Sequence, residues 1–263
     1  MDARPIGIFD SGVGGLTVAD KLFRFLPGED IIYFGDTARV PYGNKSRETV
    51  TRFSGEIVGF LQKFKVKLVI VACNTASSLS LETLKKAFSV PVVGVIEPGA
   101  ELALTLSKKR RVGIIGTEAT IASAVYKREI KSRDKGCAVF QKSCPLFVPL
   151  VENRWLNGRI TRETARRYLS PLLKRDPDVI VLGCTHYPLL KGVIKKIAGR
   201  KVRLVDSSAA VADYVRAFLR EKDMLNTRGR GRARFFVSDD TKSFAGLAKV
   251  FLKKKIKAKK VVL

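Results

Sequence analysis

Short apolar runs alternate along the chain with stretches in which apolar residues recur at helical spacing. The runs that we predict to form strands are 6–10, 30–36, 67–73, 90–96, 110–116, 178–184 and 202–206. Segments with helical periodicity lie between them, at 16–26, 46–64, 80–88, 161–175 and 187–199. Strands rich in Val and Ile that alternate with helices predict an α/β fold with parallel sheets and helices on both faces.

The two halves of the chain carry similar patterns. IGIFDS at 6–11 resembles VGIIGT at 112–117, and the strand that ends at Cys73 resembles the strand that ends at Cys184. We therefore predict two similar, pseudo-duplicated parallel-sheet α/β domains. The segment after VRLVDSS has no counterpart at that point in the first half. We accordingly assign residues 1–97 plus 208–263 to the first domain and residues 98–207 to the second.

The charge of the chain is strongly basic. Its 263 residues include 50 Lys and Arg against 24 Asp and Glu, which gives a formal net charge of +26. Much of the excess lies in RGRGRAR at 228–234 and in the lysine-rich segment 249–263. Such charge suits a solvated surface, or attracts nucleic acid, an acidic membrane or a small anionic substrate.

Nothing in the sequence indicates a membrane or secreted protein. No apolar run is long enough to span a bilayer, and the N-terminus lacks the charged-then-apolar layout of a secretion signal. We therefore expect a cytoplasmic protein with no membrane partner. Four cysteines in a chain of this size do not form a disulfide framework, so each one is a packing residue or a reactive thiol.

Two of the cysteines lie at positions that favour a reactive thiol. Cys73 and Cys184 each end a predicted strand and precede polar residues and a helix pattern. A thiol at a helix start experiences positive potential, which lowers its pKa and raises its thiolate fraction. We interpret these two as reactive. Cys137 and Cys144 lack this setting, and we interpret them as structural.

His186 is the only histidine and lies two residues after Cys184. Imidazole can hold or supply the proton of a thiol, which favours a catalytic role. A zinc site of Cys73, Cys184 and His186 is the alternative, although the chain lacks the local ligand pairs that zinc sites favour. DSGVGG at 10–15 fails the dinucleotide-binding and P-loop patterns, and we interpret it as a turn that leads into a helix.

Six motifs follow one another along the chain: IGIFDSGVGGLTV, GDTARVPYG, ACNTAS, CPLFVPLVE, LGCTHYPLL and RFFVSDD. Together they resemble the cofactor-independent glutamate racemases of the aspartate/glutamate racemase superfamily, from residue 6 to about residue 252. The resemblance implies an isomerase with its active site between two α/β domains, which supplies D-glutamate for peptidoglycan and hence for cell-wall biogenesis and cell shape. It implies catalytic roles for Cys73, Cys184, Asp10, Glu152 and His186. It implies substrate-binding positions at Asp10, Ser11, Tyr42, Gly43, Asn74, Thr75, Thr117, Thr185 and His186.

The chemistry of racemisation accounts for two thiols. Inversion of an α-carbon requires removal of a proton from one face and delivery of a proton to the other, so two groups must stand on opposite sides. In this scheme Asp10 lies near Cys73, and His186 with Glu152 lies near Cys184.

We therefore expect racemisation of glutamate with no cofactor and no metal. The alternatives are a racemase of aspartate or another amino acid, and a basic nucleic-acid-binding protein. We also expect a homodimer. Nucleic acid is a secondary partner that the basic C-terminal region would suit.

Overall fold

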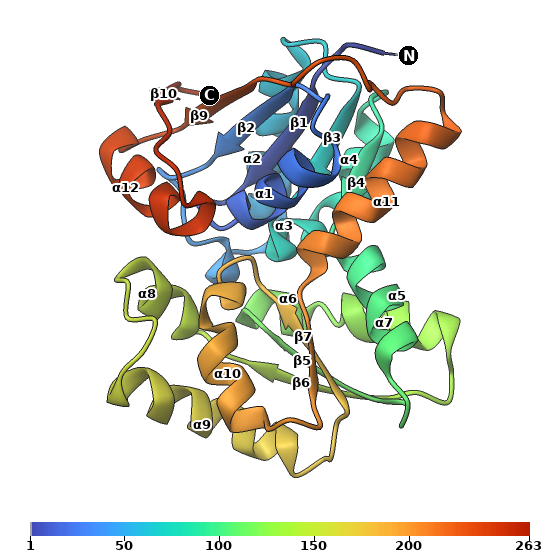
Figure 1. Ribbon diagram of the computed structural model, residues 1–263, viewed down its shortest axis with the longest axis vertical. Coiled ribbons are helices and arrows are strands. Elements are labelled where there is room, and N and C mark those ends of the chain that lie inside the picture. The colour runs from blue at the N-terminus through green and yellow to red at the C-terminus, as the bar shows by residue number, and fades with distance from the viewer. Residues whose placement is uncertain (1) are drawn as a thin grey trace.

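The computed structural model describes residues 2–263 and contains two parallel sheets. Sheet A has the strand order β10-β9-β2-β1-β3-β4, and sheet B has the order β6-β5-β7-β8. Every strand pair in both sheets is parallel, which confirms the predicted fold class. Figure 1 shows the two sheets one above the other, with the short helices α3 and α6 between them.

Sheet A is covered by helices on both faces. Its strands are β1 (Ile6–Asp10), β2 (Ile31–Gly35), β3 (Leu68–Val71), β4 (Val92–Gly94), β9 (Ala233–Val237) and β10 (Ala258–Lys260). One face packs on α1 (Leu16–Phe25), α11 (Ser207–Glu221) and α12 (Thr241–Leu252). The other face packs on α2 (Arg47–Gln62), α3 (Asn74–Leu79) and α4 (Leu81–Ala87). The central strands are apolar on both sides because both of their faces are buried.

Sheet B is smaller and has the same construction. Its strands are β5 (Arg111–Gly116), β6 (Ala138–Ser143), β7 (Val179–Gly183) and β8 (Arg203–Val205). Its helices are α5 (Ile96–Leu106), α6 (Glu118–Ala122), α7 (Val125–Arg133), α8 (Phe147–Glu152), α9 (Arg159–Leu173) and α10 (Lys191–Ala198). Short 3₁₀ helices span Tyr42–Asn44 and Tyr187–Leu190. None of the helices in residues 2–263 has the length and apolarity that crossing a bilayer requires.

The chain passes from one sheet to the other through two helices. The predicted boundary at 97/98 falls inside α5, and the boundary at 207/208 falls in the first turn of α11. After α11 the chain returns to sheet A and adds β9 and β10 at its edge. The exact domain boundaries remain a prediction.

The lysine-rich tail is part of the fold. Ala258–Lys260 forms β10, which pairs with β9, and the amide of Val261 donates to the carbonyl of Val237 at 2.9 Å. Segment 253–263 therefore includes β10, an edge strand of sheet A, and is more than a charged surface in contact with solvent.

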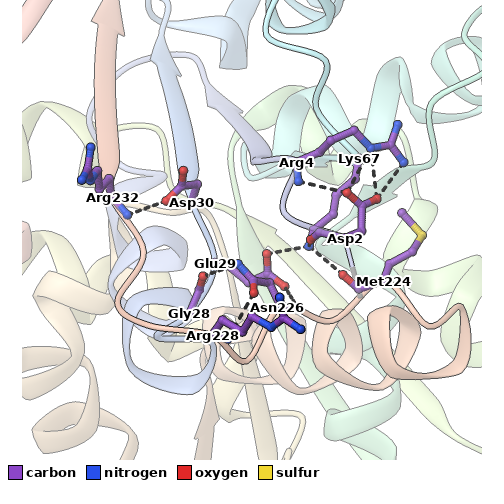
Figure 2. Close-up of polar contacts among 10 residues, drawn as sticks. All are labelled: Asp2, Arg4, Gly28, Glu29, Asp30, Lys67, Met224, Asn226, Arg228 and Arg232. Carbon is purple, nitrogen blue, oxygen red and sulfur yellow. Dashed lines mark hydrogen bonds and ion pairs between the residues drawn. The ribbon is translucent and has the colours of Figure 1, made fainter.

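A buried ion pair holds two distant segments at the amino-terminal edge of sheet A (Figure 2). The ammonium of Lys67 lies 2.6 Å from the carboxylate of Glu29, and both side chains are almost completely buried. Lys67 also donates to the carbonyl oxygens of Asp2 and Met224, at 2.6 and 2.7 Å. A buried ammonium is stable only when it is paired and hydrogen-bonded. This contact therefore fixes the start of the chain and the segment after α11 to the same point.

Candidate active site

A cavity of about 400 Å³ lies where loops that follow the strands of the two sheets meet. Carboxyl ends of parallel strands are the usual ligand-binding edge of such sheets. Of the predicted site residues, those that line the cavity are Ser11, Tyr42, Gly43, Cys73, Asn74, Thr75, Thr117, Glu152, Cys184, Thr185 and His186. The sequence did not single out these further lining residues: Val40, Glu118, Pro145, Val148, Pro149 and Asn153. Asp10 is the one predicted residue that does not line it.

Cys73 enters the cavity from sheet A. It follows β3 and caps α3, where its sulfur accepts a hydrogen bond from the amide of Ala76 at 3.5 Å. Its thiol donates to the hydroxyl of Ser11 at 3.7 Å. Burial, together with the nearby charge of Asp10, raises the pKa of Cys73 to about 12. The expectation of a lowered pKa is therefore wrong for Cys73, because loss of solvation outweighs the one amide at the helix start.

Cys184 enters the cavity from sheet B, at the end of β7, and is paired with His186. The sulfur lies 3.9 Å from Nδ1 of His186, and Nε2 of the same ring lies 3.2 Å from a carboxylate oxygen of Glu152. Burial disfavours the imidazolium, but the hydrogen bonds with Cys184 and Glu152 outweigh it and raise the pKa of His186 to about 10. At neutral pH the ring is positively charged. The charged ring faces the sulfur of Cys184.

Asp10 lies at the end of β1, fully buried between the two domains. One carboxylate oxygen accepts from the amide of Gly12 at 3.0 Å, and the other accepts from the hydroxyl of Thr185 at 3.2 Å. Burial raises the pKa of Asp10, while the positive charge of His186 and the backbone amides oppose that rise. Asp10 thus accepts a hydrogen bond from Thr185, which follows β7, while its negative charge raises the pKa of Cys73.

A cluster of hydroxyl groups, two of which line the cavity, joins the two domains. The hydroxyl of Thr75 lies 2.9 Å from that of Thr117 and 3.3 Å from that of Thr120, and the latter two are 2.9 Å apart. The hydroxyl of Tyr126 donates to the side-chain carbonyl of Asn74 at 2.7 Å. Sequence reasoning missed Thr120 and Tyr126. The one sequence signal for Thr120 is the Thr-x-x-Thr spacing at the start of α6. In that spacing the side chain of Thr117 accepts a hydrogen bond from the amide of Thr120.

Gly14 in DSGVGG allows the two domains to touch. A Cβ atom at Gly14 would collide with the hydroxyl of Thr185 and lie only 2.7 Å from Nδ1 of His186. The motif that we interpreted as a turn into a helix is therefore also the surface against which the Thr185–His186 turn packs. A side chain there would displace the imidazole that faces Cys184.

The zinc alternative is not supported. Within residues 2–263, no group of three His, Cys, Asp or Glu side chains is arranged to hold a metal ion. The other ring nitrogen of His186, Nε2, faces the carboxylate of Glu152.

Comparisons with known proteins agree with these features. The family model for Asp/Glu/hydantoin racemases matches residues 6–215. A curated glutamate racemase from Geobacter metallireducens is 51% identical over 253 residues, which cover 96% of this chain and 94% of that protein. The crystal structure of a glutamate racemase isoform from Bacillus anthracis is 40% identical with a TM-score of 0.97, and covers 100% of this chain and 99% of that one. A Francisella tularensis glutamate racemase, solved in complex with D-glutamate, is 38% identical with a TM-score of 0.93, covering 100% and 98%. The chain therefore belongs to the glutamate racemases of the Asp/Glu/hydantoin racemase family.

Proposed function

We propose that the protein interconverts L-glutamate and D-glutamate by two-base proton transfer at the α-carbon. The observation that carries the proposal is the entry of two thiols into one cavity from facing sheets, Cys73 after β3 and Cys184 after β7. The names of the similar proteins, including the one solved with D-glutamate, support glutamate as the substrate.

The two thiols have different surroundings and take different parts in each direction. Cys73, with its pKa of about 12, is a thiol at neutral pH and is ready to donate a proton. Cys184 faces the charged imidazole of His186 and serves as the base. In one direction Cys184 takes the α-proton and Cys73 delivers its proton to the opposite face. The reaction leaves Cys184 as the thiol and Cys73 as the thiolate, which is the starting state for the reverse direction.

The carbanion must be stabilised by groups of the chain itself. As the α-proton leaves, charge develops on the substrate carboxylate, and hydrogen-bond donors fixed around it lower the barrier. The donors that line the cavity are the side chains of Ser11, Asn74, Thr75, Thr117 and Thr185. Because every step uses these groups and the two thiols, we expect the activity to survive exhaustive treatment with a chelator and to need no added cofactor.

A deuterium experiment tests the two-base scheme. In heavy water, product enantiomer formed early in the reaction should carry deuterium at the α-carbon, while recovered substrate stays largely protiated. The reason is that the delivered proton comes from the second thiol, which has exchanged with solvent. Chiral separation and mass spectrometry measure both pools. Protiated product at low conversion would instead indicate a single base that carries one proton across.

The substrate is tested separately by comparing turnover of glutamate and aspartate. We expect glutamate to be strongly preferred, and a preference for aspartate would overturn the substrate assignment without touching the two-base scheme. We further propose that the product supplies peptidoglycan synthesis and that the enzyme works in the reducing cytoplasm. The four cysteines are free thiols, as that compartment requires.

We also propose that the protein forms a homodimer. Leu146, Trp155 and Ile160 are each more than half exposed around an apolar groove beside α8 and α9. Exposed apolar patches of this kind favour protein contacts. Sedimentation should show a dimer that Trp155→Ser combined with Ile160→Asp converts to a monomer. A wild-type monomer at high concentration would refute it.

A further inference from the structure

The two basic runs of the chain converge on one edge of sheet A. The parallel pairing of β10 with β9 places Lys259 opposite Phe236 and brings the tail lysines beside Arg234. The guanidinium of Arg234 lies 4.7 Å from the centre of the Phe64 ring, so the end of α2 is adjacent as well. We call this surface the basic edge and define it by Lys63, Lys65, Arg228, Arg230, Arg232, Arg234, Lys257 and Lys259, all of which are exposed.

The cations of the basic edge have no carboxylate partners. Within residues 2–263, none of these eight side chains forms an ion pair. Two carboxylates at the start of β2, which the loop before β9 contacts, have partners of their own. Glu29 pairs with the buried Lys67, and Asp30 accepts the backbone amide of Arg232 at 2.7 Å (Figure 2). The positive charge is therefore left for an external anion.

The backbone that carries the arginines is firmly held. Asn226 donates two hydrogen bonds to the segment before β2. Its backbone amide donates to the carboxylate of Glu29 at 2.8 Å, and its side chain donates to the carbonyl of Gly28 at 2.9 Å (Figure 2). The amide of Arg228 then donates to the side chain of Asn226 at 3.1 Å, and the amide of Gly231 donates to the carbonyl of Pro27 at 2.8 Å. Binding would therefore order only side chains and not the loop, which lowers its entropic cost.

Gly231 has a specific role in this anchoring. A Cβ atom at Gly231 would clash with the backbone carbonyl of Glu29, so glycine allows the loop backbone to pack directly against the residues that precede β2. Within RGRGRAR, Gly231 thus makes the close backbone contact, while Gly229 has a positive φ of 65° and open space around it.

The chemistry of the edge selects phosphodiesters. Guanidinium groups bind phosphate oxygens in a bidentate manner, and a row of unpaired cations matches a polymer with one charge per repeat. The eight residues that define the edge are all Lys or Arg, and none of them is an aromatic ring or a side-chain amide that would read a base.

We propose that the basic edge binds the phosphodiester backbone of nucleic acid without sequence preference. Arg228 to Arg234 precede or open β9, at the amino-terminal edge of sheet A, whereas the catalytic thiols follow the carboxyl ends of β3 and β7. Bound nucleic acid would leave the cavity open. The interaction therefore adds to the proposed racemisation and does not depend on it.

The test measures binding of a fluorescent DNA duplex by anisotropy over a range of salt concentrations. The edge variant replaces Arg228, Arg230, Arg232 and Arg234 with Gln. A matched control replaces Arg159, Arg162, Arg167 and Lys196, exposed cations of the second domain, with Gln, and so removes the same charge. We expect the edge variant to bind at least about tenfold more weakly near physiological salt, with the slope of log K against log salt reduced by about 3 to 4. The control should change affinity by less than about twofold.

Equal losses in the two variants would overturn the proposal, because binding would then follow net charge and not this surface. Failure of the wild type to bind at physiological salt would overturn it as well. Tighter binding to phosphatidylglycerol vesicles that displaces the duplex would assign the edge to membranes instead. Competition between duplex DNA and RNA of equal length identifies which nucleic acid is preferred. If the arginine variant unfolds, replacement of Lys63, Lys65, Lys257 and Lys259 supplies the same test, and retained glutamate turnover verifies the fold.

Discussion

Ser238 donates its hydroxyl to the carboxylate of Asp36 at 2.8 Å, although 202 residues separate them in the chain. Asp36 is fully buried and also accepts hydrogen bonds from Arg39, at 2.7 Å, and from the hydroxyl of Tyr42. Tyr42 lines the cavity. The end of β9, which lies outside the residues matched by the family model, therefore supports the loop that carries a predicted substrate-binding residue.

The first prediction is that Ser238→Ala weakens substrate binding more than turnover. The variant loses the hydrogen bond to Asp36 and the one that the Ser238 hydroxyl accepts from the amide of Ala38 at 2.9 Å. If the loosened loop costs about 1 kcal/mol of substrate binding, KM for glutamate should rise about fivefold, with kcat changed by less than about twofold. Initial rates over a range of glutamate concentrations measure both. Ser238→Thr, which keeps the hydroxyl, should restore KM, and Ser170→Ala on the surface of α9 should have no effect. A fall in kcat at constant KM would contradict this role.

The second prediction compares two glycines of one motif. Gly14→Ala should lower kcat/KM by at least about tenfold, because its Cβ would displace the Thr185–His186 turn. Gly12→Ala is the matched control, since its Cβ would meet only Val40 at an ordinary 3.6 Å and its amide would still donate to Asp10. Circular dichroism should show both variants folded. Equal activity of the two variants would mean that the turn tolerates displacement.

The sequence predicted the central strands well because their burial on both faces leaves continuous apolar runs, as in VIVLG of β7. It did not predict β6, β9 and β10. Every residue of β6 is only half-buried, and β10 is AKK, so edge strands of this kind are held by backbone pairing that leaves no apolar pattern.

The candidate site was predicted to a similar degree. Residues with distinctive side chains at strand ends, such as Cys73 and His186, stand out in the sequence and do line the cavity. Asp36 and Ser238 were missed because their meeting depends on β9 pairing with β2, a contact over some two hundred residues. The raised pKa of Cys73 was missed because burial cannot be judged from a helix-start pattern alone.

The third prediction separates reactive from structural cysteines. Cys73→Ala and Cys184→Ala should each lower kcat by about 10²-fold or more, because each variant lacks a proton donor or acceptor on one face. Cys144 is equally buried but lies outside the cavity, so Cys144→Ala should keep turnover and lose only stability. Chiral assays and thermal unfolding distinguish the two outcomes. Near-normal racemisation by either thiol variant would defeat the two-base scheme.

The last prediction concerns pH and follows from the charge of His186. Its pKa is raised from 6.5 to about 10 in the folded protein, so the folded state binds this proton more tightly than the unfolded chain does. The stabilisation from His186 is therefore fully present below pH 6.5, and it is lost as the pH rises through about 10. His186→Asn lacks this contribution, so the difference in unfolding free energy between wild type and variant should shrink across that window.

The same proton should govern the rate in the direction that uses Cys184 as base. The imidazolium of His186 faces the sulfur of Cys184, and loss of its proton removes the positive charge beside that base. We therefore expect kcat/KM of the wild type to fall on the alkaline side with an apparent pKa near 10. Urea denaturation and initial rates over one pH series measure the two effects on the same samples. Glu152→Gln, which removes the carboxylate behind the ring, should move both transitions to lower pH, since it takes away one of the contacts that raise the pKa. Transitions that stay in place in Glu152→Gln would show that Glu152 does not hold the proton on His186.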